Sequence, residues 1–169
     1  MDIARTPEVA PPVTIHRGDY TPFPWLVPEV SLAFLLGLEE TVVTATLAVR
    51  RNPAGDGAAT IRLNGDGIAA CSVMVDGVAA SGWRMDGADL LIDLSGDAHE
   101  LRIETRIDPA ANSHLMGLYA SGGMLCTQCE AEGFRRITFF PDRPDVLSTY
   151  RVRMEGDKAL FPVLLSNGN

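Results

Sequence analysis

The feature that most constrains the fold of this chain is a period of two in its apolar residues. Alternate positions are apolar in the stretch from Val30 to Leu36, and again in "TVVTATLAVRR" (41–51) and "ELRIETRI" (100–107). Because successive side chains of a strand point to opposite faces, each stretch predicts a strand with one buried face. Strands with one wet face usually pair antiparallel.

Turn signals separate these stretches at short intervals. They are Asn52-Pro53, Asn64-Gly65, Asp66-Gly67, Asp76-Gly77, Asp86-Gly87 and Ser95-Gly96. Further strands are expected at 135–140, 146–155 and 158–165, with "PDRPDV" between the first two as a tight turn or one helical turn. No amphipathic helix of ordinary length and no internal repeat is evident. The sequence therefore predicts an all-β fold, an antiparallel β-sandwich or saddle with little helix.

The first part of the chain has a different composition. Residues 1–28 carry six of the eleven prolines, and each proline removes a sheet donor, so we expect an extended N-terminal arm followed by a β-rich domain over 29–169. The arm lacks the apolar core of a secretory signal. Three cysteines are too few for a disulfide framework, so we expect a cytoplasmic protein in a reducing compartment.

Charge limits the classes of partner. The chain has 22 acidic and 14 basic residues and a net charge of -8, which repels phosphate backbones and anionic lipid. We expect neither nucleic acid nor a membrane as partner. The last third is locally basic, and two interpretations stay open there, a solvated face or contact with an acidic partner domain. Its arginines are Arg135, Arg136, Arg143, Arg151 and Arg153.

The stretch "CTQCE" (126–130) contains two competing patterns. A zinc site built on Cys126 and Cys129 needs a second ligand pair, and none of the other candidates stands at ligand spacing. Those candidates are Cys71, His16, His99 and His114. If the segment is extended, the two sulfurs lie on opposite faces, roughly 10 Å apart. We therefore expect half-buried thiols, with no metal and no disulfide.

Gln128 and Glu130 form the other pattern. Their separation of two residues places both on one face of an extended segment, where an amide oxygen and a carboxylate suit an ammonium group. A solvated polar face is the alternative.

The nearby "HELRI" (99–103) begins like a zinc-peptidase signature but lacks the second histidine and lies in a strand, so we expect His99 at the surface. No catalytic residue is assigned.

A longer match carries more information than these patterns. The stretch "GLYASGGMLCTQCEAEGFRRITFFPDRPDVL", followed by "FPVLLSNGN", resembles the N-terminal domain of the bacterial aminopeptidase N family, zinc-dependent gluzincin metallopeptidases of the alanyl aminopeptidase type. Weaker matches run from "GDYTPFPW" through "TVVTATLAVRR", "IRLNG" and "DPAANSHLMGLY". The resemblance covers nearly the whole chain.

The resemblance implies a four-domain enzyme that hydrolyses N-terminal residues from peptides. It implies a β-rich saddle that covers the catalytic domain and a loop whose Gln128 and Glu130 bind the free α-ammonium of the substrate. The zinc ligands, the general-base glutamate and the one zinc ion are implied for the next domain. This chain is then expected to bind no metal or cofactor, to be inactive alone, and to have the catalytic domain of the same polypeptide and peptide N-termini as partners.

The same resemblance predicts that the domain continues beyond Asn169, so that a truncated fragment exposes a sheet edge and self-associates or has a mobile C-terminus. The alternative function is a non-enzymatic β-sandwich binding module for carbohydrate or protein. Such modules usually expose aromatic residues, and here aromatics make up 7%. A redox protein using Cys126 and Cys129 is a third class, disfavoured by the expected geometry.

Overall fold

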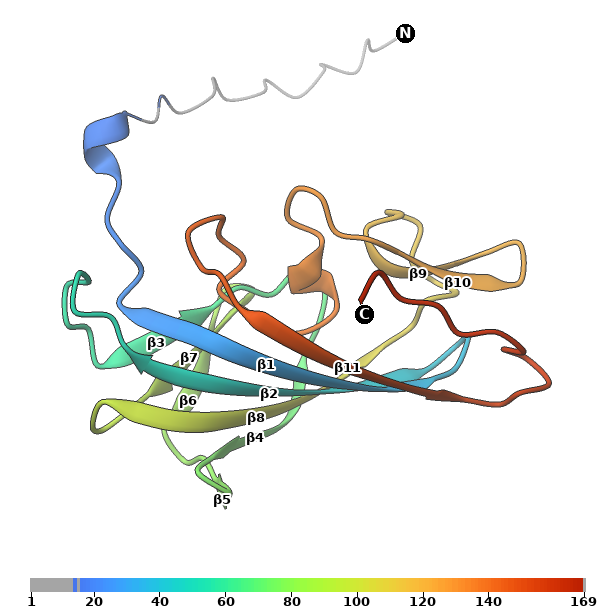
Figure 1. Ribbon diagram of the computed structural model, residues 1–169, viewed down its shortest axis with the longest axis horizontal. Helices are drawn as coiled ribbons and strands as arrows, with labels where there is room; N and C mark the ends of the chain where they lie inside the picture. Colours follow the sequence, from blue (N-terminus) through green and yellow to red (C-terminus); the bar gives the residue numbers. More distant parts are fainter. Residues whose placement is uncertain (1–13, 15, 169) are drawn as a thin grey trace, which may run out of the picture.

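The computed structural model describes residues 14 and 16–168, which form strands with two short 3-10 helices (Figure 1). No helix in this part of the chain is long and apolar enough to cross a membrane. The elements in chain order are η1 (Arg17–Asp19), β1 (Trp25–Leu36), β2 (Thr41–Arg51), β3 (Thr60–Leu63), β4 (Ala70–Val75), β5 (Val78–Ala79), β6 (Trp83–Asp86), β7 (Asp89–Asp93), β8 (Ala98–Ile107), β9 (Gly117–Ser121), β10 (Met124–Gln128), η2 (Phe134–Arg136) and β11 (Thr149–Gly156).

The strands form three sheets, which confirms the all-β prediction. The largest has six strands in the order β11-β1-β2-β8-β4-β5, a second has three in the order β3-β7-β6, and β9 and β10 form a hairpin. The strand pairs are antiparallel except one, because β11 runs parallel to β1 at the edge of the large sheet. The chain reaches this edge by a long return through η2, which allows a parallel pair where a hairpin would not.

The core lies on one face of the six-stranded sheet. Its inward side chains are the alternating residues predicted from the sequence, and they pack against β3 and β7 of the small sheet. The buried residues of this layer include Val30, Leu32, Ala45, Leu47, Val49, Leu101, Ile103, Ile61, Leu63, Leu90 and Ile92. A second cluster, Val43, Leu118 and Ile137, lies on the same face of β2 beneath the β9–β10 hairpin. The opposite face of the large sheet carries the polar set.

Trp25 closes one end of the core and is fully buried. The Arg51 guanidinium lies 4.0 Å from the centre of its ring, a cation–π contact, and the His99 ring lies 6.2 Å away. His99 Nδ1 is 2.7 Å from Asp76 Oδ2, and only 10% of the His99 side chain is exposed, so the predicted surface position of His99 is wrong. Asp76 and Gly77, at φ 51° and 78°, form the predicted hairpin turn between β4 and β5.

Two of the strands expected near the end of the chain are absent from the described residues. In place of a strand at 135–140, η2 is followed by Phe139 and Phe140, which enter the core with only a single bridge from Phe140 to Asn64. In place of a strand at 158–165, Asp157 accepts backbone hydrogen bonds that close a turn. The third strand, β11, begins at Thr149, and "PDRPDV" forms the predicted turn through a Val146 N to Arg143 O bond of 3.2 Å.

The start of the domain also differs from the boundary expected after Pro28. Strand β1 begins at Trp25, and Phe23 is already buried. Asn52 holds this entry segment, because its side chain donates to Phe23 O at 2.7 Å and its backbone N–H donates to Pro24 O at 2.9 Å. Half of the proline-rich arm, residues 1–13 and 15, lies outside the described residues.

Asp76→Asn tests the contact at this hairpin. The hydrogen bond from His99 lowers the pKa of Asp76 below its ordinary value of 3.8. A carboxylate whose pKa is lower in the folded state than in the unfolded state stabilises the fold at pH values above its unfolded pKa, and this stabilisation is lost as the pH falls through the folded pKa. The wild type should therefore resist urea better than the variant at neutral pH. The difference should disappear in acid below the ordinary pKa. Asparagine tolerates the positive φ of this turn and keeps one oxygen that can accept from the Glu100 N–H, while the charge and the second acceptor oxygen are lost.

The exposed carboxylate Asp97 supplies the control, because 93% of its side chain is exposed and its contact with Arg51 is 3.9 Å long. Asp97→Asn should change urea stability little at any pH. If the difference in urea stability between wild type and Asp76→Asn is the same at neutral and acid pH, the Asp76 charge is not what stabilises the hairpin.

Candidate functional site

The β9–β10 hairpin carries the candidate site at its open end. Gly122 and Gly123, at φ 57° and 81°, form the two-residue turn that joins the strands, a conformation that favours glycine. The register then places Gln128, the last residue of β10, opposite Gly117, the first residue of β9. The hairpin therefore places Gln128 at the edge of the second core cluster.

The extended backbone expected through Glu130 ends at Gln128, so that part of the prediction is wrong. From Cys129 the chain turns, and the N–H of Gly133 donates to Cys129 O at 2.8 Å. The turn folds Glu130 back, so that Gln128 Nε2 donates to the Glu130 carbonyl at 3.3 Å. The two residues do lie together, but a closed turn brings them together rather than strand alternation.

Both candidate side chains are exposed and rich in acceptors. The donor end of the Gln128 amide is used by the Glu130 carbonyl, which leaves its oxygen free to accept. Within residues 14 and 16–168, no hydrogen bond or ion pair engages the Glu130 carboxylate, whereas Glu132 on the same turn lies 3.3 Å from Arg135. An uncommitted carboxylate beside an amide oxygen can accept from an ammonium group.

Two glycines make this turn possible, and sequence analysis missed both. A Cβ on Gly133 would stand 2.4 Å from Gln128 O and 2.8 Å from Cys129 Cα. A Cβ on Gly117 would stand 2.7 Å from Arg136 Cβ, and Gly117 has φ 75°. Turn and hairpin thus approach each other closely only because both residues lack a side chain.

Ion pairs anchor the far side of the turn. Arg135 Nε and backbone N lie 3.0 and 3.2 Å from Asp142 Oδ2, and Arg135 Nη2 donates to Asp142 O at 3.0 Å. Arg136 Nε lies 2.8 Å from Asp66 Oδ2. Neither reading of these two arginines from the sequence, as a solvated face or a partner contact, is right, because both are half-buried in internal pairs. For Arg135, the aspartate at position 142 within "PDRPD" was the available signal, whereas nothing local indicated that Arg136 pairs with Asp66.

The thiols of "CTQCE" take different environments. Cys129 packs with Leu125 against the second core cluster, while Cys126 belongs to the alternate set of β10. Both are free and half-buried. Burial raises the pKa of Cys129, and the nearby Asp142 charge raises it further, so its reactive thiolate is disfavoured. No group of three or more possible metal ligands occurs among the residues that the structure describes.

The sequence of this chain is similar to those of known proteins. The profile of the Peptidase M1 N-terminal domain matches residues 84–169. Aminopeptidase N of Caulobacter vibrioides is 49% identical over 158 residues, which are 94% of this chain and 18% of that protein. Aminopeptidase N of Escherichia coli is 42% identical over the same shares. The chain thus spans 18% of the length of these relatives.

A solved structure agrees in fold. The Legionella pneumophila aminopeptidase A, crystallised in complex with aspartic acid, superposes with a TM-score of 0.82 at 26% identity, covering 89% of this chain and 18% of that one. The sheets and hairpin described above therefore have a close structural counterpart in a longer protein.

Gly133→Ala tests whether the closed turn depends on a missing side chain. The added methyl group must displace backbone atoms of Gln128 and Cys129, so we expect a loss of about 1–3 kcal/mol in urea unfolding, as in overpacked sites. Gly82→Ala is the control, because its Cβ would meet only Asp93 Cβ at 3.9 Å. Equal stability of the two variants would contradict the packing described for the turn.

Proposed function

The chain belongs to the M1 peptidase family, whose N-terminal domain it forms, and we propose that it recognises the substrate amine for a zinc aminopeptidase that removes N-terminal residues from peptides. The observation that carries the proposal is the pair of uncommitted acceptors on the turn after β10, the Glu130 carboxylate and the Gln128 amide oxygen. The named activity of the relatives supports it, since both are aminopeptidases.

The proposed role is a choice between a free amino terminus and an internal amide. An α-ammonium has three donors and a positive charge, which Glu130 balances while the Gln128 oxygen adds direction. An internal amide offers a single neutral donor, so it would leave these acceptors unsatisfied, and that loss provides discrimination. A catalytic domain placed over the turn would exclude water and strengthen both contacts.

The reaction itself is assigned to other parts of the parent enzyme. The described residues offer no ligand set that fits a zinc ion, so no step of the proposal runs through a metal held by this chain. The zinc and the general base are proposed to lie in the catalytic domain, and the chain alone is proposed to be inactive. Three free cysteines, Cys71, Cys126 and Cys129, are in keeping with a cytoplasmic location, which is part of the proposal.

Glu130→Ala in the full-length enzyme tests the role directly. Loss of the counter-charge should lower kcat/KM for unblocked peptides. The decrease should correspond to a loss of about 2–5 kcal/mol in transition-state stabilisation, the scale of removing one partner of an enclosed charge pair. Glu132→Ala is the matched control, because it removes a carboxylate from the same turn that faces Arg135. It should retain nearly full activity. Unchanged kcat/KM in Glu130→Ala would remove this residue from the site.

The apolar residues near β11 support a proposal about the isolated chain. Val152 and Leu165 are 45% and 85% exposed, and neighbouring apolar residues are exposed as well. We expect the catalytic domain to cover this surface in the parent enzyme, and a second copy to cover it when the chain is alone. Val152→Ser with Leu165→Ser should then reduce the concentration-dependent growth in sedimentation coefficient.

The matched control is Val78→Ser, which removes a 70% exposed valine from β5 at the opposite edge of the sheet. It should leave association unchanged. A wild-type chain that sediments as a monomer at every concentration would overturn the proposal.

A further inference from the structure

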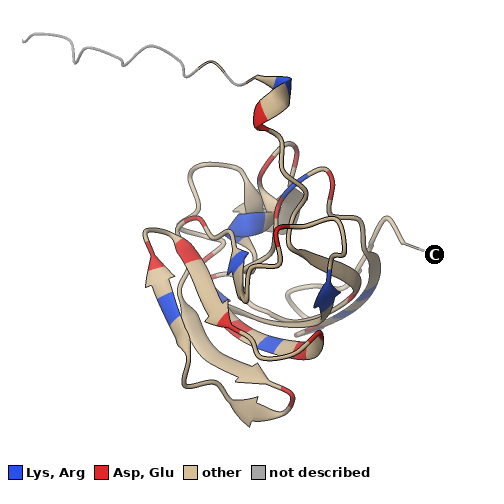
Figure 2. Cartoon of the chain, turned by 90° about the vertical axis from the view of Figure 1, so that its left-hand side faces the viewer, with Lys and Arg blue, Asp and Glu red and all other residues tan. Residues whose placement is uncertain are grey.

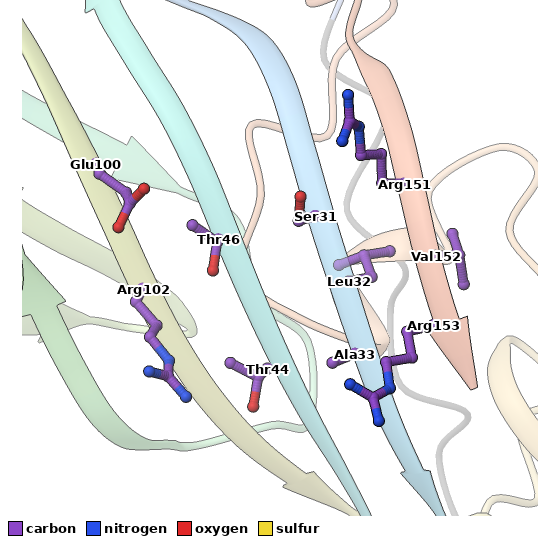
Figure 3. Close-up of a pocket in the computed structure, with 10 residues that line it drawn as sticks. All are labelled: Ser31, Leu32, Ala33, Thr44, Thr46, Glu100, Arg102, Arg151, Val152 and Arg153. Atoms are coloured by element: carbon purple, nitrogen blue, oxygen red, sulfur yellow. The ribbon is translucent and has the colours of Figure 1, made fainter. Parts of the chain in front are cut away.

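The polar face of the six-stranded sheet contains a hollow that the amine site does not use. It has a volume of about 570 Å³ and lies over β11, β1, β2 and β8 (Figure 3). Its floor consists of small or hydroxyl-bearing side chains, Ser31 and Ala33 on β1 with Thr44 and Thr46 on β2. We call this hollow the trough. It lies on the side of the sheet away from the hairpin, because Val43 and Thr44 alternate between the two faces.

Arginines line both sides of the trough. Arg102 stands on β8 at one side, and Arg151 and Arg153 stand on β11 at the other (Figure 3). Ladder register connects them in one row, in which Arg151 is opposite Ser31, Ser31 is opposite Thr46, and Thr46 is opposite Arg102. Three strand spacings separate the Cα atoms of Arg151 and Arg102 by roughly 14 Å.

Two of these arginines have no ion-pair partner among the described residues. Arg153 pairs with Glu155 at 2.6 Å, but no carboxylate among residues 14 and 16–168 lies within ion-pair distance of Arg102 or Arg151. Most other described arginines pair with acidic neighbours, with Arg17 and Arg50 as exceptions, and acidic and basic positions are interspersed over the chain (Figure 2). Since the net charge is -8, two unpaired guanidinium groups facing one hollow form a local exception.

Glu100 is the one acidic side chain of the trough and lies at the β8 side. Because Glu155 balances Arg153, the unpaired Arg102 and Arg151 together with Glu100 leave a net of one positive charge. Glu100 also repels a carboxylate placed beside it, so a ligand carboxylate at the β8 side is restricted to Arg102.

We propose that the trough binds an extended peptide segment with acidic side chains, supplied by a partner protein. Guanidinium groups bind carboxylates through paired hydrogen bonds, and the hydroxyls of Ser31, Thr44 and Thr46 suit the main chain of a peptide. Acidic residues four positions apart on one face of an extended segment are about 13 Å apart, close to the span of the arginine row.

The shape and composition of the trough favour a peptide over other anions. The hollow is open to solvent and shallow, so it does not enclose a small molecule as a typical ligand pocket does. A nucleic-acid strand needs stacking aromatics, which the lining lacks, and a field that the chain's net charge of -8 opposes. The proposal goes beyond the aminopeptidase function and does not depend on it.

The test measures fluorescence anisotropy of a labelled peptide of about eight residues, roughly 26 Å when extended, that alternates glutamate and serine. Wild type should bind it, with affinity that falls as salt rises. Arg102→Ala with Arg151→Ala should weaken binding at least about ten-fold. Glu100→Gln should strengthen it, because the repulsive charge is removed.

Arg17→Ala with Arg50→Ala is the matched control, since it removes the same charge from two exposed arginines outside the trough that have no ion-pair partner among the described residues. It should retain wild-type affinity, and a peptide with glutamine in place of glutamate should not bind. Equal losses in the two double variants would show nonspecific charge attraction and overturn the proposal. Absence of binding by wild type, or tighter binding of single-stranded DNA than of the peptide, would also overturn it.

Discussion

One-sided burial of the six-stranded sheet is the constraint on which the rest of the molecule depends. Alternate residues of β2, from Val43 to Val49, are buried on one face of the sheet and belong to two separate hydrophobic clusters. The small sheet covers one cluster and the β9–β10 hairpin covers the other. Transfer of this apolar area from water, at about 25 cal/mol per Å², fixes which face points inward. The other face is left polar, so one pattern creates both a platform for the hairpin and an open surface.

The candidate site is held by that platform rather than by its own contacts. Cys129 and Leu125 attach the hairpin to the second cluster, and the pair between Arg135 and Asp142 attaches the segment after it. Between these anchors the chain closes a turn that only a glycine at position 133 permits. The exposed acceptors of Gln128 and Glu130 thus project from a turn fixed at both ends, which limits the entropy lost when a ligand binds.

Features that follow from a repeating sequence pattern were predicted correctly, whereas features that depend on single tertiary contacts were missed. The alternation in β1, β2 and β8 and the turn at Asp76-Gly77 follow from local rules, and they are confirmed. The segment 135–140 has the composition of a strand, but Arg135 bonds to Asp142 and Phe139 fills the core, which only the tertiary structure decides. The pairing of Gln128 with Glu130 was expected from an extended chain and arises from a turn. Local periodicity carries no information about such closure.

Gln128 and Glu130 are proposed to bind the free amino group of a peptide together in the parent enzyme. The most direct measurement is a crystal structure of that full-length enzyme with an unblocked peptide bound. We expect the α-nitrogen of the peptide within about 3 Å of a Glu130 carboxylate oxygen and of the Gln128 amide oxygen. An α-nitrogen bound by other residues, with the turn after β10 facing solvent, would contradict the account.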